Sequence, residues 1–326
     1  MVEHLAGLQA QQARPPFVGL WTRLENFKKD DLMRPLSERR ILRATTIRGT
    51  LHLVSRADFL AWRPVLQPML SAGAQTILRD RLTTFDQQRV LGAARTAFSD
   101  RARTFTSLRD HLVSAFPEAD ERAMGYFVRM HLPLASVPDP SADWGFGSDA
   151  EFELASAPAA EGDAASLVTR YLGAFGPASV ADFQAWSGLK SAKAWFEALN
   201  LAAFQDEKKR ILYDLPNAPR PGAETPAPIR FIAEFDNLVL GHADRSRIVA
   251  DEHRGRVVTK NLLVLGTFLV DGFVAGVWKV ERKKSVAVLR LDPFVKLTVK
   301  ARKALEQEGE LLARFLEPEA SGYETA

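Results

Sequence analysis

The sequence predicts an α+β fold with three tandem winged helix-turn-helix units, followed by a small C-terminal β-barrel or sheet and a terminal helix. The first half carries apolar residues at helical spacing, separated by short polar turns. The order helix, helix, strand occurs three times, and repetition of one unit is stronger evidence than any single copy. After a Pro-rich segment at residues 214–228, the pattern changes to short strands with tight turns. The 326 residues, of which 46% are hydrophobic, suffice for two domains or three small ones.

The first winged-helix unit is predicted over residues 1–65. Its first helix follows Pro15 and Pro16, and its apolar stripe has i, i+3, i+4, i+7 spacing: Phe17, Leu20, Trp21 and Leu24. Residues 30–47 are expected to be helical on Leu32, Leu36, Ile41 and Leu42, with a break near Pro35 and Ser37 as the N-cap of the second piece. The alternating residues 50–54 then predict a short strand.

The second and third units are predicted over residues 66–160 and 161–218. In the second, helices at 104–116, with Thr106 as the cap, and at 119–132 precede a strand at 133–137 and a loop at 139–149. The third is the clearest copy. It has helices at 166–175, from Ser179 to Gly188, and from a cap at Ser191, and then a wing hairpin at 201–215.

The C-terminal region, residues 226–318, is predicted to form the barrel or sheet and its helix. Strands are expected at 230–240, 262–270, 272–280 and 285–291, with turns at Asp271-Gly272 and Lys283-Lys284. Residues 297–316 have the apolar spacing of a helix, and the last ten residues are expected to be a frayed tail.

Charge is distributed unevenly along the chain, although the net charge is only +3. Residues 1–130 contain 20 Lys and Arg against 13 Asp and Glu, and the remainder contains 23 against 27. A basic first part fits an anionic partner held mainly by the N-terminal region. An Arg-rich, solvated surface without such a partner would show the same balance.

Several classes of site are excluded by composition and spacing. The chain has no cysteine, so disulfides, thiolate metal sites and cysteine nucleophiles are ruled out. The histidines show neither HxH nor HExxH spacing, and neither a P-loop nor a GxSxG elbow occurs, so we expect no metal and no cofactor. No apolar run approaches 18 residues and the N-terminus lacks the pattern of a signal peptide, so we expect a cytoplasmic protein with no membrane partner.

Two glutamine amides stand at i and i+2 in the segment Gly7-Leu8-Gln9-Ala10-Gln11. On an α-helix they would point in nearly opposite directions, so they converge only where the chain is extended or turning. The following run Ala13-Arg14-Pro15-Pro16 disfavours a helix here. Convergence is therefore allowed by the sequence, and two solvent-exposed glutamines are the alternative.

A set of motifs resembles the winged helix DNA-binding family whose characterised members are AlkZ/YcaQ-like DNA glycosylases. The motifs occur in the family's order from residue 7 to about residue 282: GLQAQ, FVGLWTRL, IRGTLHLV, FGPASVADFQAWSGL, EFDNLVLGHADRSRIV and TFLVDGFVAGVWKVER. The resemblance implies three tandem winged helices and a C-terminal β-barrel that form a concave basic cradle for duplex DNA. Members usually carry a further helix before the first motif, whereas six residues precede Gly7 here. Either the assigned start codon is too late or this member lacks the helix, and in the second case the glutamine pair loses support on that side.

The resemblance also implies an activity, namely hydrolysis of the N-glycosidic bond of alkylated purines, including those in interstrand crosslinks. The family's catalytic pair lies in a Gln-x-Gln motif, which matches Gln9 and Gln11. An amide is too weak to be a general base, but an N7-alkylated purine is already cationic and leaves without protonation. The amides then need only orient a water and offer dipoles to the sugar cation. Without a lysine partner, a Schiff-base lyase is not expected.

The expected partner is duplex DNA, held by basic side chains on phosphates. In the first unit the candidates are Arg14, Arg39, Arg40, Arg43, Arg48 and His52. In the C-terminal region they are His242, Arg245 and Arg247, on a hairpin or loop that would probe the minor groove. For each arginine the alternative is an ion pair or a solvated position. For His52 the alternative is a satisfied, semi-buried side chain. For the C-terminal segment the alternative is structural, a pairing of Asp244 with Arg247.

The sequence therefore predicts a monofunctional DNA glycosylase that is monomeric, cytoplasmic and associated with the nucleoid. The main alternative is a non-catalytic winged-helix DNA-binding protein or transcriptional regulator. The sequence shows no obvious dimerisation helix, and regulators usually read paired half-sites. A scaffold whose winged helices bind protein is a third possibility.

Overall fold

The computed structural model describes residues 1–155 and 161–326 of a mixed α+β chain. Contacts divide it into two compact units. The N-terminal unit comprises Met1–Arg14 and Lys28–Ala218, and the C-terminal unit comprises Pro15–Phe27 and Pro219–Ala326. The predicted boundary at residue 160 lies outside the described residues. No helix in the described ranges is long and apolar enough to cross a membrane.

The N-terminal unit is built on an antiparallel sheet with strand order β1-β3-β2-β4-β5. The strands are β1 (Leu8–Gln9), β2 (Ile41–Thr45), β3 (Leu51–Ser55), β4 (Leu134–Ser136) and β5 (Phe152–Leu154). The prediction of a helix through residues 41–47 is wrong, because β2 pairs with β3 along its whole length and is buried on both faces. Helix α2 (Lys29–Ser37) ends at Ser37, the residue expected to begin a helix.

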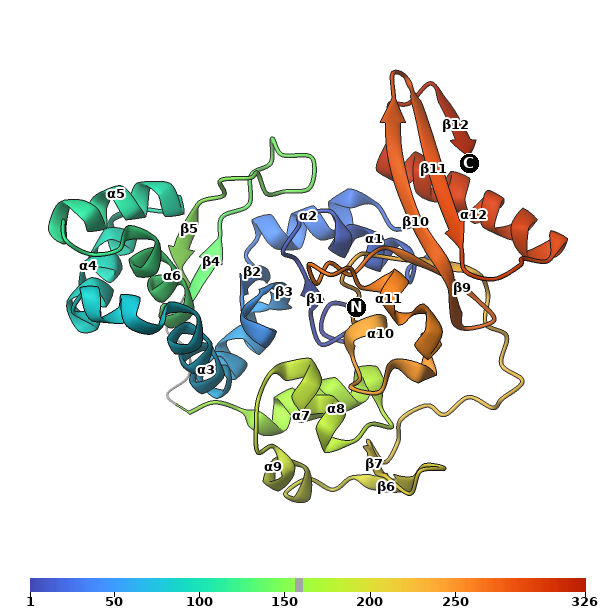
Figure 1. The fold of residues 1–326 in the computed structure, drawn as a ribbon, viewed down its shortest axis with the longest axis horizontal. Coiled ribbons are helices and arrows are strands. Elements are labelled where there is room, and N and C mark those ends of the chain that lie inside the picture. Colours follow the sequence, from blue (N-terminus) through green and yellow to red (C-terminus); the bar gives the residue numbers. More distant parts are fainter. Residues whose placement is uncertain (156–160) are drawn as a thin grey trace. The chain divides into compact units, whose positions relative to one another are not determined.

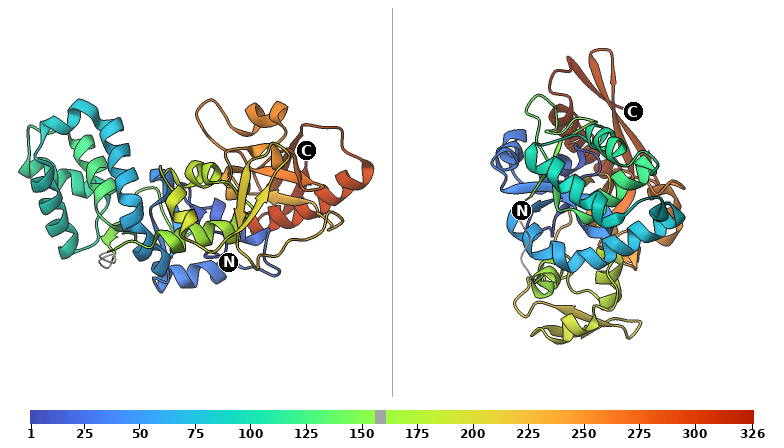
Figure 2. Two further views of the ribbon diagram at one scale, coloured as in Figure 1. Left: turned by 90° about the horizontal axis from the view of Figure 1, so that it is seen from below. Right: turned by 90° about the vertical axis from the view of Figure 1, so that its left-hand side faces the viewer.

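A helical layer covers this sheet at one end (Figure 1). It consists of α3 (Arg56–Leu78), α4 (Gln87–Asp100), α5 (Phe105–Ala115) and α6 (Glu121–His131). Figure 2 shows α4, α5 and α6 gathered beside α3, and all three pack on one another through a shared apolar core. Thr104, and not Thr106, caps α5.

The third helical segment follows the predicted order closely. It contains α7 (Ala164–Phe175), α8 (Val180–Ser187), α9 (Lys193–Glu197) and the hairpin β6 (Ala202–Gln205) and β7 (Ile211–Asp214). The limits of α8 agree with prediction, since Ser179 caps its start and Gly188 its end. Helix α9 begins at Lys193, with Ala192 and not Ser191 as its N-cap. Aromatic side chains from α7 to α9 form the core.

The C-terminal unit contains an open sheet with strand order β12-β11-β10-β9-β8, and not the predicted closed barrel. Its elements are α1 (Pro15–Trp21), β8 (Arg230–Ile232), α10 (Asn237–Leu240), α11 (Arg254–Val257), β9 (Thr267–Val270), β10 (Phe273–Lys283), β11 (Val286–Pro293), α12 (Val299–Leu316) and β12 (Gly322–Thr325). Helix α12 packs on β8, β11 and β12 (Figure 1). Its buried apolar residues cover one face of the sheet, which in a closed barrel would be covered by other strands.

Two segments of this unit differ from prediction. Residues 230–240, expected as one strand, divide into β8 and α10, because Asp236 accepts a hydrogen bond from the Leu238 amide and so begins a helix. The tail, expected to fray, forms β12, which pairs in parallel with β11. The turn at Asp271-Gly272 is present, and both residues have positive φ.

Candidate active site

Strand β1 presents the first glutamine of the pair. Gln9 lies directly opposite His52 on β3, and the Ala10 amide continues the ladder by donating to the Leu51 carbonyl at 2.7 Å. Gly7 permits this entry, because its φ is +89° and an added Cβ would lie 2.9 Å from Val54 Cγ1. The chain is therefore extended at Gln9, the condition under which the two amides share a side.

The second glutamine folds back onto the end of this ladder. The Leu51 amide donates to Gln11 Oε1 at 3.3 Å, while the Ala10 carbonyl accepts from Arg43 Nε at 2.8 Å. The Gln11 side chain thus takes a hydrogen bond that a main-chain carbonyl would otherwise receive. Since only the oxygen of an amide can accept, this contact defines which way the Gln11 amide is turned.

Arg48 orients the Gln9 amide in the same manner. Its Nη2 donates to Gln9 Oε1 at 2.9 Å, and its Nη1 donates to the Trp186 carbonyl at the end of α8. Arg48 lies in the turn between β2 and β3 with a φ of +54°. One guanidinium therefore joins the glutamine motif to a helix carbonyl that has no partner within its own helix.

His52 is completely buried beside this pair. Its Nδ1 lies 3.1 Å from the Thr50 carbonyl, so this nitrogen carries the proton, and Nε2 is a buried acceptor without a hydrogen-bond partner in the described residues. Burial, and to a smaller extent the Arg48 charge, lower the pKa of His52 to about 3, although the Thr50 carbonyl acts in the opposite direction. The imidazole is therefore neutral at physiological pH.

Arg43 is a buried cation that holds the main chain of the glutamine motif in place. Besides Ala10, it donates to the Gln11 carbonyl at 3.2 Å and lies over the Phe146 ring at 4.8 Å. Burial, with the Arg129 charge, lowers its pKa to about 10, so it remains protonated. Arg43 therefore fixes the main chain at Ala10 and Gln11 and makes no hydrogen bond to the glutamine side chains in the described residues.

The other predicted arginines of the first unit are closer to solvent. Arg40 is exposed and pairs with Glu38 at 2.6 Å. Arg39 donates to the Ser136 carbonyl at 2.7 Å and pairs with Glu153. Arg14 is partly exposed after the glutamine motif.

In the C-terminal unit the predicted hairpin or loop is a short 3₁₀ turn, Arg245–Arg247, capped by Asp244. Arg247 Nη1 lies 3.5 Å from His242 Nε2, and Ser246 donates to Asp244 at 2.6 Å. All three predicted side chains, His242, Arg245 and Arg247, are partly exposed. Burial lowers the pKa of Arg245, and the Arg254 charge adds to the effect.

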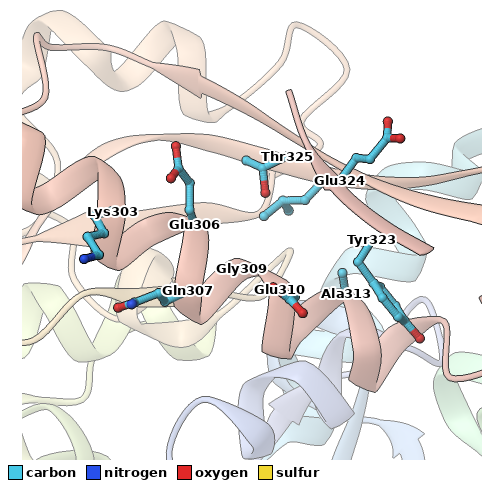
Figure 3. Close-up of a pocket in the computed structure, with 10 residues that line it drawn as sticks. Lys303, Glu306, Gln307, Gly309, Glu310, Ala313, Tyr323, Glu324 and Thr325 are labelled. Atoms are coloured by element: carbon cyan, nitrogen blue, oxygen red, sulfur yellow. The ribbon is translucent and has the colours of Figure 1, made fainter.

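A hollow of about 360 Å³ between α12 and β12 is a poor alternative site (Figure 3). Carboxylates of Glu306, Glu310 and Glu324 line it, with Lys303 at one side. Such a lining repels the phosphates of DNA.

The sequence indicated Arg43 and Arg48 as DNA contacts and did not indicate that they support the glutamine motif. The Trp186 carbonyl was indicated indirectly, because a helix ending at Gly188 leaves acceptors that a cation can satisfy. The cluster in which Arg170 contacts Asp58 at 3.4 Å and Glu3 at 3.5 Å joins α7, α3 and the N-terminal turn. No local signal pointed to it. Burial raises the pKa of Asp58, and Arg170 opposes that shift.

Comparison with known families decides the affiliation of the chain. The family model described as DNA glycosylase AlkZ-like matches residues 2–315. This chain belongs to the AlkZ-like DNA glycosylase family. The resemblance inferred from the sequence motifs is thereby confirmed.

A curated sequence and a solved structure, both from Streptomyces sahachiroi, agree with this assignment. One is named an interstrand DNA cross-link repair glycosylase and is 24% identical over 345 residues, which cover 96% of this chain and 89% of the relative. The solved structure of the S. sahachiroi DNA glycosylase AlkZ matches with a TM-score of 0.75 at 21% identity, covering 100% of this chain and 92% of that one. The AlkZ fold therefore extends over the described length of this protein.

Proposed function

We propose that this protein is a monofunctional DNA glycosylase that hydrolyses the N-glycosidic bond of N7-alkylated or interstrand-crosslinked purine nucleotides in duplex DNA. The observation that carries the proposal is the support of the Gln-x-Gln motif. Arg48 orients Gln9, the β3 main chain orients Gln11, and Arg43 holds the chain between them. Gln9 is half-buried and Gln11 is exposed, so side chains held in this way are preorganised for chemistry and still open to a substrate.

In the proposed mechanism each amide oxygen uses the lone pair that accepts no hydrogen bond from the protein. A carbonyl oxygen has two lone pairs, and one of these on Gln9 and on Gln11 accepts from Arg48 and Leu51 respectively. The second lone pair is directed at the nucleophilic water and at the sugar cation that develops as the purine leaves. The lesion is a cationic N7-alkylpurine that departs as the neutral base, so departure needs no general acid, and the water that adds to the sugar cation releases its proton to solvent.

Neutral His52 fits this scheme. A charged imidazole beside Arg48 would place a second positive charge next to a reaction centre that itself becomes cationic. Burial keeps His52 neutral and so removes that repulsion. We propose a supporting role for His52 and Arg43, and phosphate contacts for the more exposed Arg14, Arg39 and Arg40 and for His242, Arg245 and Arg247.

Duplex DNA is the proposed partner, bound by a monomer through the winged-helix units predicted over residues 1–218. A regulator that reads sequence would not need two amides fixed by a buried strand and an arginine, so the glycosylase is the better supported function. Association with the nucleoid follows from this partner.

The test is base release from duplexes carrying a single N7-methylguanine or an N7-guanine crosslink. Gln9→Ala combined with Gln11→Ala is expected to lower the single-turnover rate about 10²-fold or more, because two transition-state contacts are lost. The matched control is Gln87→Ala with Gln88→Ala, an exposed pair at the start of α4. If the first double variant folds and releases base as fast as the wild type, the assignment of the pair is wrong.

A further inference from the structure

We infer that an apolar cavity lined by Arg48, the residue that orients Gln9, binds the planar, apolar, non-nucleotide part of a bulky N7-purine lesion. This inference rests on the proposed glycosylase function and adds to it a binding site for the aromatic part of a bulky adduct, with the residues that would recognise it. The cavity lies entirely within the N-terminal unit and has a volume of about 640 Å³.

One wall of the cavity is a single face of α3. Val65, Met69 and Gly73 follow one another at intervals of four residues and so lie along one side of the helix. Leu189 and Trp195, which follow α8, form the opposite wall. The lining is therefore mainly aliphatic, with one thioether and one indole ring available for contact with a flat apolar group.

The space exists because small residues line it. Gly73 has no side chain, and an added Cβ there would contact only the Met130 methyl, at 3.7 Å. Ala72 is the next residue of the lining on α3, and Gly188, with a φ of +81°, forms the turn at the end of α8. Larger side chains at these positions on α3 would fill the cavity, so substitutions there can test whether it binds a ligand.

The volume decides which part of a lesion the cavity suits. Sites for small organic molecules in proteins span roughly 300–1,000 Å³, so the cavity has the size of such a site. A methylated base adds only a methyl group to the nucleotide and would leave the space nearly empty. An aromatic adduct of one or more rings would fill much of it and bury its own apolar surface.

Arg48 connects the cavity to the chemistry. The residue lines the cavity, and its guanidinium is the one that donates to Gln9 Oε1 at 2.9 Å. A planar ring stacks favourably on a guanidinium face, because that face is flat and weakly hydrated. An occupant would therefore lie against the residue whose guanidinium orients Gln9. Arg48 and Lys190 also place positive charge at the cavity, in keeping with a ligand carried on DNA.

The test compares duplexes carrying one N7-benzylguanine or one N7-methylguanine, for the rate of base release by the full-length protein. For binding, the same lesions are built on 2′-fluoroarabinose, which slows their hydrolysis. Two variants fill the cavity, Gly73→Leu and Ala72→Phe, the second at an exposed helix position. The control is Gly92→Leu on α4, where no atom lies within 4 Å of an added Cβ. Thermal melting verifies that each variant folds.

We expect the wild type to favour the benzyl over the methyl lesion, and both cavity variants to lower that ratio about tenfold, in rate and in affinity. The Gly92→Leu ratio is expected to match the wild type. An unchanged ratio in a folded cavity variant, or the same loss in the control, overturns the inference. If the wild type releases neither base, the proposed function fails. The affinity ratios on the stabilised duplexes then still decide whether the cavity binds the adduct.

Discussion

Arg48 satisfies two acceptors that lie far apart in the sequence, Gln9 Oε1 and the Trp186 carbonyl. A guanidinium can do this because its N–H donors diverge in a rigid plane, whereas the donors of an ammonium group all lie on one nitrogen. In the proposed mechanism its contribution is the orientation of an amide that touches the substrate. It is therefore a positioning residue.

Replacing Arg48 by Met is expected to lower kcat for base release by roughly 10- to 100-fold, the equivalent of a lost hydrogen bond to a charged group. The affinity for lesion-containing DNA should change much less. Arg48→Lys should recover only part of the rate, because it cannot reach both acceptors. Arg314→Met, at an exposed pair with Glu310, is the control. A large loss of DNA affinity with kcat intact would instead make Arg48 a phosphate contact.

His52 makes the fold sensitive to acid. Its pKa is lowered from 6.5 to about 3 in the native state, so between these values only the unfolded chain binds the proton. The free energy of unfolding therefore falls as the pH drops below 6.5, and at pH 5 the loss from this group is about 2 kcal/mol. Urea denaturation at pH 7.5 and pH 5 measures it.

The comparison variant is His52→Asn, which keeps a donor for the Thr50 carbonyl but does not titrate in this range. Its stability should decrease less between the two pH values than that of the wild type. Equal decreases in both proteins would show that His52 does not cause the acid sensitivity.

At the residue scale the sequence selected side chains that the structure brings together, but it did not predict their environments. Gln9, Gln11, Arg43, Arg48 and His52 were all selected, and the structure gathers them around β1 and β3. That Arg43 and His52 are buried could not be read from the motif, because burial depends on β2, β4 and the loop that carries Phe146. These elements are distant in the sequence.

At the scale of elements, α8 was predictable because its signals are local. Ser179 and Asp182 form a reciprocal capping box, and Gly188 ends the helix with a positive φ that glycine adopts at low cost. The strand β2 was not predictable, since its apolar spacing is also compatible with a helix. Only its pairing with β3 excludes the helix.

Ser179→Ala is expected to reduce the free energy of unfolding by about 1–2 kcal/mol, because the Asp182 amide loses its acceptor at the helix start. Ser179→Thr keeps a hydroxyl acceptor and should lose much less. Chemical denaturation monitored by circular dichroism measures both. If the alanine variant is as stable as the threonine variant, the cap does not contribute as argued.

At the scale of the whole molecule, residues 15–27 join a unit formed mostly by residues more than 200 positions later. Arg23 makes two hydrogen bonds to the buried Asp236, at 2.8 and 2.9 Å, and the Trp21 ring stacks on Phe315 at 6.0 Å. The ion pair and the aromatic contact both contribute to this association.

Arg23→Ala is expected to destabilise the protein by about 3 kcal/mol, because it leaves the Asp236 carboxylate buried without its cation. Arg40→Ala, which removes an exposed ion pair, should cost about 1 kcal/mol or less. Urea denaturation followed by tryptophan fluorescence compares the two. Equal losses would mean that burial of Asp236 has no special role.

The sequence by itself determined the family, the glutamine pair, the limits of α8 and the α+β class. These features are encoded in short motifs, caps and periodicity, which depend on neighbouring residues only. The tertiary structure decided that the C-terminal sheet is open, that β2 is a strand, that residues 15–27 belong with the C-terminal unit, and that His52 and Arg43 are buried. Each of these depends on partners distant in the chain. Hydrogen-bond pairing and exclusion of water arise only when those partners meet.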